Sequence, residues 1–390
     1  MRTYRYYQTA FATIPMPFAF LDLDLLEENA QQIRLQSNEK SIRIASKAIR
    51  CVSVLKRLLQ FDELFSGIMC YSAPEALHLS HHGFDDLLIG YPVWDKKWLE
   101  ALAYEVQNGR SLTLTVDSLA LTEHLEQIAK QIGTVLPVCL EADMSSNLLG
   151  YHFGVWRSPI RSRENALTVL RKIGASDHLL LDGVIGFEAQ IANGYDRYPR
   201  SFLKNQFIRV MKSYSMREIA ERRAMLVRTV RDLGLTPRFV NGGGTGSLHL
   251  TSREEVITEV TVGSGFFAPG LLDYFADFRY RPAAGFALEI VRRPDSDLYT
   301  CSGNVLAAAN NGIKVPAPLL PAGAKLLPGE ASGEVQTPIR YRGLETLELG
   351  DPIFFRPAWS GELGERFSQL VCISRGQIVE VASTYRGDGL

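Results

Sequence analysis

The chain has 390 residues, of which 46% are apolar and 22% charged, with a formal net charge of −1. These values are typical of a globular protein with one large and one smaller domain, and they give no reason to expect nucleic acid or a membrane as partner. The five cysteines are scattered without a CxxC pair, which favours the reducing cytoplasm. We expect a small substrate, no signal peptide and no membrane span, because no apolar run reaches roughly 18 to 20 residues.

The first two thirds of the chain alternate short apolar runs with amphipathic stretches. An opening strand at 18–22 and a helical segment come first, and stretches such as 118–133, which ends at a glycine, separate most of the later runs. Eight βα units over roughly 225 residues predict an α/β fold, a closed (β/α)8 TIM barrel, with an open doubly wound sheet as the alternative. The eight candidate strands are IRIAS (42–46), GIMCYS (67–72), DLLIGYP (86–92), LTLTVD (112–117), VLPVCLEAD (135–143), LLLDGVIGFEA (179–189), RFVNGG (238–243) and TEVTVGSG (258–265).

Past about residue 275 the pattern changes to short β-like runs separated by proline and glycine, such as FALEIVRRP (286–294) and DPIFFRP (351–357). This pattern is typical of a mostly-β domain. We therefore expect a barrel domain over 18–275 and a β domain over 276–390 together with residues 1–17. The N-terminal strand is a further candidate for the sheet of the β domain.

The carboxyl ends of the strands form the active face of a TIM barrel, so the residue after each run is a candidate for chemistry. Lys47 follows the first run, and alone it would most simply be a solvent-exposed cation. Asp117 would most simply be the N-cap of the next helix. The other polar residues at these ends are Tyr71, Ser72, Tyr91, Asp143, Glu188, Gln190 and the segments 241–247 and 263–265.

Two glycine-rich stretches, NGGGTGS (241–247) and VGSG (262–265), follow the last two strands, where barrels frequently bind phosphate through backbone N–H groups. Two tight turns without a ligand are the alternative. A dinucleotide site is disfavoured because the GxGxxG spacing is absent, and a P-loop because no GK[ST] is present. A lysine amine can attack a carbonyl and hold it as a Schiff base, so lysine and phosphate loops together indicate pyridoxal 5'-phosphate.

The segments RIASKAIRC, GIMCYSAPEALHLSHHGFDDLLIGYP, GFEAQIANG, FVNGGGTGS and TEVTVGSGFFAPGLLDYF resemble the alanine racemase-like (fold type III) pyridoxal phosphate enzymes. Within them they are similar to the branch of D-threonine aldolases and D-serine dehydratases, and to bacterial proteins called amino acid deaminase/aldolase. The resemblance covers nearly the whole chain, and it depends on the order and spacing of the segments more than on any one of them.

The resemblance implies that Lys47 forms the Schiff base with the cofactor. In such enzymes an arginine of an RxG motif faces the pyridine nitrogen. Here the corresponding stretch reads EADMSSNLLGYHFGVWRSP (141–159), with His152 at the nearest match and Arg157 five residues later, so which of the two faces the ring stays open. The remaining cofactor-binding candidates are Tyr71, Asn241, Gly243, Gly244, Thr245, Gly263, Ser264 and Gly265.

The aldolase and dehydratase relatives carry a divalent metal bound by a histidine and a cysteine, within a stretch similar to GDPIFFRPAWSGELGERF (350–367). This chain has no histidine after His249, and the stretch has no cysteine, so we expect no metal. Glu334, Glu362 and Glu365 could bind a hard cation through oxygen, but clustered glutamates are more often solvated surface.

The resemblance implies a lyase, an aldolase or a deaminase/dehydratase, that acts on a small, D-configured β-hydroxy amino acid as a homodimer. Candidates for a second acid–base group are His152, Glu188, Tyr71 and Glu334. The alternatives are an amino-acid racemase of the same fold and a pyridoxal phosphate-binding protein without turnover.

Overall fold

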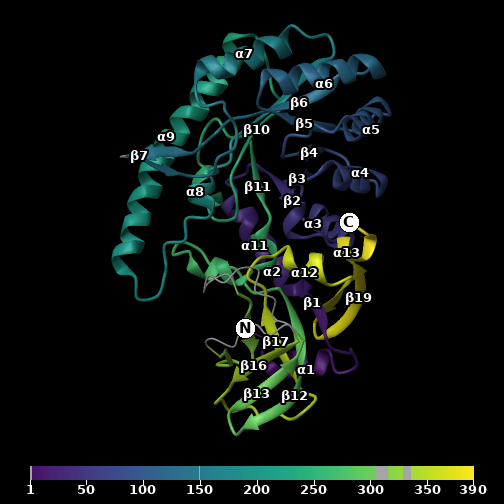
Figure 1. Cartoon of the computed structure of the whole chain (residues 1–390), viewed down its shortest axis with the longest axis vertical. Coiled ribbons are helices and arrows are strands. Elements are labelled where there is room, and N and C mark those ends of the chain that lie inside the picture. Colours follow the sequence, from purple (N-terminus) through teal and green to yellow (C-terminus); the bar gives the residue numbers. More distant parts are fainter. Residues whose placement is uncertain (1, 149, 304–314, 328–334) are drawn as a thin grey trace.

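The structure is a computed structural model that describes residues 2–148, 150–303, 315–327 and 335–390. A closed barrel of eight parallel strands occupies the upper part of Figure 1. Each strand overlaps one of the eight predicted runs, so the (β/α)8 prediction is confirmed. In barrel order the strands are β10 (Phe239–Gly242), β11 (Glu259–Val262), β2 (Ser41–Ala45), β3 (Phe65–Cys70), β4 (Leu87–Ile89), β5 (Leu112–Val116), β6 (Leu136–Glu141) and β9 (Leu179–Ile185).

Helices follow most strands and cover the outside of the barrel. In α6 (Leu119–Ile132), Leu121, Leu125 and Ile128 recur at helical spacing and are buried, and Gly133 ends the helix in the left-handed conformation at φ 75°. The N-cap prediction for Asp117 is wrong, because the side chain of Ser118 accepts the hydrogen bond from Leu121 N–H. The other covering helices include α3 (Val52–Leu59), α4 (Ala73–His81), α5 (Lys96–Gln107), α7 (Arg163–Gly174) and α9 (Phe202–Asp232).

A second, mixed sheet lies below the barrel in Figure 1 and contains the C-terminal strands, as predicted. β1 (Phe18–Asp22) is an interior strand of this sheet and pairs with β12 and β18. The N-terminal strand thus joins the sheet of the C-terminal strands, for which the sequence made it a candidate. The barrel domain over 18–275 and the division at about residue 275 stay predictions. The other strands of the sheet are β12 (Ala284–Asp295), β13 (Leu298–Ser302), β14 (Ala317–Leu320), β15 (Lys325–Leu326), β16 (Gln336–Arg340), β17 (Pro352–Arg356), β18 (Gln369–Ser374) and β19 (Gln377–Ser383).

The N-terminal helix α1 (Tyr4–Ala10) packs on this sheet through aromatic side chains. The ring of Tyr7 lies 5.0 Å from that of Phe20 and 5.5 Å from that of Phe354. All three residues are almost completely buried. Tilted aromatic pairs at such distances add to the stabilisation from burial, so the first residues of the chain form part of the core of the β domain.

A buried arginine joins the sheet to the mouth of the barrel. Arg356, the last residue of β17, donates from Nε to the carbonyl oxygen of Ala268 at 2.7 Å and from Nη2 to that of Pro269 at 3.0 Å. Its Nη1 also pairs with Asp273 at 2.7 Å. These contacts fix the segment after β17 over the loop that follows β11. Helix α12 (Glu362–Arg366) lies in that segment, at the junction of the two parts in Figure 1.

Among the described residues, no helix is both long enough and apolar enough to cross a membrane.

Candidate active site

A cavity of about 510 Å³ lies at the carboxyl end of the barrel strands, and its size is that of a small-molecule site. Residues of the barrel loops and of the segment around α12 line it together. Most of the predicted loop residues are on its wall. These are Lys47, Arg157, Asn241, Gly243, Gly244, Thr245, Gly263 and Ser264.

Lys47 lies in the short 3-10 helix η1 (Ser46–Ala48) that follows β2, and its side chain is solvent-accessible. Its Nζ donates to the hydroxyl of Tyr91 at 2.8 Å. Because β11 pairs with β2 through Val262 and Ile44, the loop after β11 lies beside the lysine. The amine and the second glycine loop therefore lie at neighbouring strand ends.

The two glycine loops follow β10 and β11, which are adjacent strands. Gly243 has φ +93°, a conformation that favours glycine. A Cβ atom at Gly263 would lie 2.8 Å from the Cβ of Ala48, so only glycine lets the loop after β11 approach η1 this closely. Ser264 opens the short helix α11 (Ser264–Phe267), whose first N–H groups have no partner within the helix. The N–H groups of Gly243, Gly244 and Gly265 donate to Glu188, Ser247 and Thr245. The backbone at Thr245 and Ser264 is therefore the part of the two loops that can offer donors to the cavity beside Lys47.

Asn241 is held below these loops by buried polar side chains. Its Nδ2 donates to Glu259 Oε1 at 2.7 Å and to Thr261 Oγ1 at 2.8 Å. Glu259 in turn pairs with the fully buried Arg43 at 2.8 Å. This network fills the interior of the barrel and fixes the floor of the cavity, in agreement with the rule that buried charges are paired.

Arg157 enters the wall between two aromatic rings. Its guanidinium carbon lies 5.1 Å from the ring centre of Tyr91 and 5.6 Å from that of Phe187. Its Nη2 pairs with Glu141 Oε1 at 2.6 Å and also donates to the carbonyl oxygen of Gly90 at 3.2 Å. The side chain is thereby held in one orientation at the cavity wall.

Burial raises the pKa of Glu141 to about 7, although the adjacent Arg157 opposes the shift. The folded protein therefore binds more protons at this carboxyl than the unfolded chain does. Its contribution to stability is complete below about pH 4.5 and is lost as the pH rises through about 7. We expect the unfolding free energy to fall in this window by up to about 1.4 kcal/mol per pH unit relative to Glu141→Gln.

Urea unfolding of both proteins across this pH range measures the difference. Glu123→Gln serves as control, because Glu123 is an exposed residue of α6. Parallel curves for the wild type and Glu141→Gln would contradict the expectation.

Glu188 is not on the cavity wall, which argues against the predicted acid–base role. Its carboxylate is completely buried, pairs with Arg223, and accepts from Ser247 at 2.7 Å, from Thr251 at 2.5 Å and from Gly243 N–H at 3.2 Å. Burial disfavours its charge, but Arg223 and the hydroxyls hold its pKa below the usual range. Glu188 therefore supports the first glycine loop from behind, as a positioning residue.

Three further predicted site residues lie away from the wall. His152 is on the β7–β8 hairpin (Ser146–Leu148 and Tyr151–Phe153), where its ring stacks on Trp156 at 3.7 Å. The ring of Tyr71 lies under Arg50, and Gly265 N–H donates to Thr245 Oγ1 at 3.0 Å. Of these three residues, only Gly265 belongs to a glycine loop, and it contacts the other glycine loop at Thr245. Glu334 falls outside the described residues.

The β domain contributes residues that the sequence argument did not assign to the cofactor or to catalysis. Trp359, Glu362, Glu365 and Arg366 line the cavity from the segment around α12. Glu365 pairs with Arg50 at 2.8 Å. One feature of the sequence could have indicated that this segment reaches the cavity, namely the two glycines of SGELGERF, Gly361 and Gly364, which let the segment approach the barrel closely. In the part of the chain that the structure describes, no group of three or more histidine, cysteine, aspartate or glutamate residues could hold a metal ion.

The sequence model of the family described as alanine racemase, N-terminal domain, matches residues 21–267, more than half of the chain. The chain belongs to this family. Aldolases and dehydratases of the alanine racemase-like family depend on pyridoxal 5'-phosphate, and they act on small amino acids.

Among characterised relatives, the chain is similar to a 3-hydroxy-D-aspartate aldolase of Paracoccus denitrificans (strain Pd 1222). The two sequences are 25% identical over 255 residues, which make up 65% of this chain and 60% of the relative. It is also similar to a D-threonine aldolase of Arthrobacter sp, with 26% identity over 68% of this chain and 64% of the relative. The matched region thus spans less than two thirds of both relatives.

Two solved structures share the complete fold. A D-threonine aldolase from Filomicrobium marinum superposes with a TM-score of 0.81 at 19% identity, covering 96% of each chain. A D-threo-3-hydroxyaspartate dehydratase from Delftia sp. HT23 superposes with a TM-score of 0.74 at 17% identity, covering 95% of this chain and 98% of that one. The barrel and the mixed sheet together are therefore a fold that this chain shares with both proteins.

Proposed function

We propose that this protein is a pyridoxal phosphate-dependent lyase that acts on a small, D-configured β-hydroxy amino acid by Cα–Cβ cleavage or elimination. The observation that carries the proposal is the placement of the Lys47 amine and both glycine loops on one cavity wall. The five cysteines are free and buried, which agrees with the cytoplasmic location that the sequence predicts.

The residues present fit the cofactor. Lys47 would hold its carbonyl carbon, and the backbone at Thr245 and Ser264 would hold its phosphate, since glycine-rich loops and a helix start offer N–H donors to an anion. The N–H groups of Gly243 and Gly244 already donate to Glu188 and Ser247. When bound, the cofactor supplies a ring system that stabilises negative charge at the Cα of the substrate. Tyr91 orients the Lys47 Nζ, which can take up or release a proton once the substrate amine has replaced it.

Arg157 is the better candidate for the residue that faces the ring nitrogen. It lies on the cavity wall and is fixed by Glu141 and Gly90. His152 bonds instead to Asn147 at 3.1 Å within its own hairpin. A permanently charged guanidinium at this place would disfavour protonation of the ring nitrogen.

The side chain of Arg366 is evidence that the substrate carries a negative charge. It lines the cavity, and within the described residues no ion pair or hydrogen bond of its side chain is found, whereas Arg50 and Arg157 are paired with Glu365 and Glu141. An unpaired guanidinium suits a carboxylate, which it can bind through two N–H donors. We assign to Arg366 the carboxylate of the amino acid.

The assay is a screen of the purified, cofactor-loaded protein with the D and L forms of serine, threonine, alanine and 3-hydroxyaspartate. The proposal expects glycine plus an aldehyde, or a keto acid plus ammonia, from a D-β-hydroxy amino acid. Formation of the opposite enantiomer alone would identify a racemase. Bound cofactor without any product would identify a binding protein, and either result would overturn the proposal.

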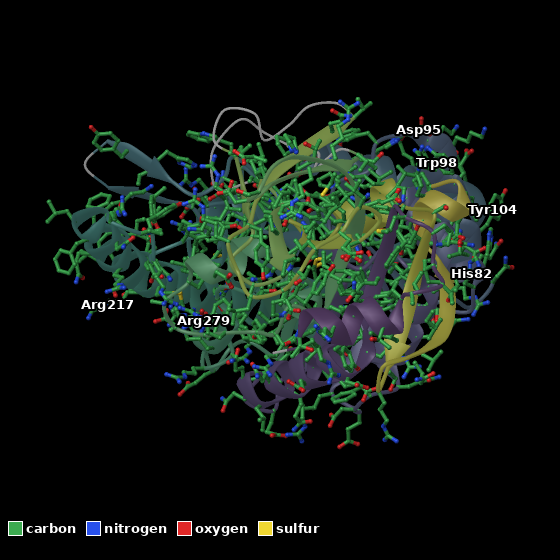
Figure 2. The ribbon with its side chains drawn as sticks, turned by 90° about the horizontal axis from the view of Figure 1, so that it is seen from below. His82, Asp95, Trp98, Tyr104, Arg217 and Arg279 are labelled. Carbon is green, nitrogen blue, oxygen red and sulfur yellow. The ribbon has the colours of Figure 1, made fainter. Side chains whose placement is uncertain are left out.

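We also propose a homodimer that forms through α9. Leu203, Phe207, Val210 and Tyr214 are exposed, Leu203 to 82% and Phe207 to 62%, and their 4-3-4 spacing is that of a coiled-coil seam. A second copy would present the same stripe across a two-fold axis. Arg217, further along α9, lies at the edge of the molecule opposite Trp98 and Tyr104 of α5 (Figure 2), and α9 runs along this outer edge in Figure 1.

Replacing Phe207 with lysine places a charge in the seam and should convert a two-chain species into single chains. Light scattering after size-exclusion chromatography measures the mass. Leu35→Lys is the control, because Leu35 is an equally apolar residue, 66% exposed, on α2 (Leu23–Gln36). A wild-type protein with the mass of one chain, or a dimer unaffected by Phe207→Lys, would disprove this interface.

A further inference from the structure

Helix α12 is inserted into the mouth of the barrel with very close backbone contacts. A Cβ atom at Gly361 would clash with the carbonyl oxygen of Lys47, and one at Gly364 would clash with the Cβ of Arg50. Only glycine permits this approach at both positions. As a result the first residue of α12, Glu362, lies next to a glycine that touches the backbone of Lys47.

Glu362 lines the cavity and is only 7% exposed. One carboxyl oxygen, Oε2, accepts from the N–H of Ala358 at 3.2 Å. The other, Oε1, is shielded from solvent and has no hydrogen-bond partner among the described atoms. Leaving a buried polar atom unpaired costs about 1–3 kcal/mol, and at a cavity wall a bound ligand or a proton would remove this cost.

The surroundings of Glu362 favour a carboxyl that retains its proton more strongly than an exposed glutamate. Burial raises its pKa, and Glu365 on the same helix adds to the shift. The N–H groups of Trp359 and Ala358 and the cation of Arg366 oppose it. From the barrel side, Lys47 donates to Tyr91 and Arg50 pairs with Glu365, so neither forms an ion pair with Glu362.

We propose that Glu362 exchanges a proton with the β-hydroxyl of the substrate, so that this carboxyl is the second acid–base group of the site. The inference rests on the proposed lyase function and names the residue that the sequence left open.

In the cleavage direction the ionised Oε1 takes the proton of the β-hydroxyl. The electron pair of the O–H bond becomes the second C–O bond of the released aldehyde. The Cα–Cβ bond breaks, and its electron pair stays at Cα, where a proton from solvent or Lys47 completes glycine. The charges and atoms balance, and no oxidant is required. In an elimination Lys47 would instead take the proton from Cα, and the electron pair of that C–H bond would form the Cα–Cβ double bond. The protonated carboxyl would give its proton to the departing hydroxyl, which leaves as water with the electron pair of the C–O bond.

The test compares Glu362→Gln with the wild type, both loaded with cofactor. Glutamine keeps the size of the side chain and the bond from Ala358 N–H but cannot take up a proton. We expect kcat to fall by about a hundredfold to ten-thousandfold, with KM changed less than about threefold. The acid limb of the pH profile of kcat should disappear as well. Glu348→Gln, an exposed glutamate of the β domain, should behave as wild type.

Two readouts separate proton transfer from a structural role. Formate added to Glu362→Ala should restore part of the rate, since it can occupy the vacated volume, and it should not restore Glu362→Gln. Difference infrared spectra taken across the acid limb should show a carboxyl band that is missing in Glu362→Gln. Wild-type activity should resist a chelator.

The proposal fails if Glu362→Gln keeps more than about a third of the wild-type kcat together with the acid limb of the pH profile. It also fails if a chelator abolishes wild-type turnover and an added divalent cation restores it. If the wild type and Glu362→Gln are both active lyases, the role of Glu362 is wrong while the proposed function stands. A wild type that binds cofactor but cleaves no D-β-hydroxy amino acid would overturn the proposed function, and this inference with it.

Discussion

Replacing Lys47 with alanine should lower turnover by at least about a thousandfold while the protein stays folded. The amine is the only lysine nitrogen on the described cavity wall, so no other side chain there can form a Schiff base with the carbonyl carbon of the cofactor. The loss should therefore appear in kcat, and added cofactor should not reverse it.

The same substitution should change the unfolding free energy by no more than about 0.5 kcal/mol, because the side chain is solvent-accessible and its one bond is to Tyr91. Steady-state kinetics and urea unfolding measure the two effects. Lys97→Ala, an exposed lysine of α5, is the matched control. Turnover that survives in Lys47→Ala would show that the chemistry takes place elsewhere.

Replacing Glu188 with alanine should have the largest effect on stability, a loss of about 3–5 kcal/mol in unfolding free energy. The substitution leaves Arg223, which is 2% exposed, without one of its two carboxylate partners. It also leaves the Thr251 hydroxyl and the Gly243 N–H buried without their acceptor, and it removes the nearer of the two acceptors of the Ser247 hydroxyl. Each orphaned donor adds a desolvation cost.

Glu188 holds the loop that follows β10 through its hydrogen bonds with Gly243 and Ser247. The variant should therefore also bind pyridoxal phosphate more weakly. Urea unfolding without cofactor measures the first effect, and equilibrium titration with cofactor measures the second. Glu123→Ala, on the surface of α6, is the control. A loss of less than about 1 kcal/mol would mean that the buried pair contributes little to the native state.

The barrel was predictable because its strands are short apolar runs with polar residues at their ends. Period and length identify such strands without knowledge of tertiary contacts. For the same reason Lys47 and the glycine loops were found, since their position relative to a strand end fixes their position on the active face. The strand at 18–22 was identified as well, but its sheet depends on pairing with residues more than 250 positions away.

The roles of individual acids were less predictable. Both Glu188 and Lys47 lie just after a barrel strand. The Glu188 carboxylate nevertheless lies in a buried cluster with Arg223, which is 35 residues later, on α9. Glu362 looks like one of several glutamates in a polar stretch. It becomes buried only because Gly361 and Gly364 allow α12 to dock on the barrel. Such long-range packing leaves little trace in local sequence patterns.

The most direct test of the central claim is to locate the cofactor on the chain. The protein is incubated with pyridoxal 5'-phosphate, treated with borohydride, digested and analysed by mass spectrometry. The account predicts that the reduced cofactor is attached to the peptide that contains Lys47, and that prior incubation with the preferred substrate reduces this labelling. Labelling of another lysine, or unchanged labelling in Lys47→Ala, would contradict the assignment of this cavity as the active site.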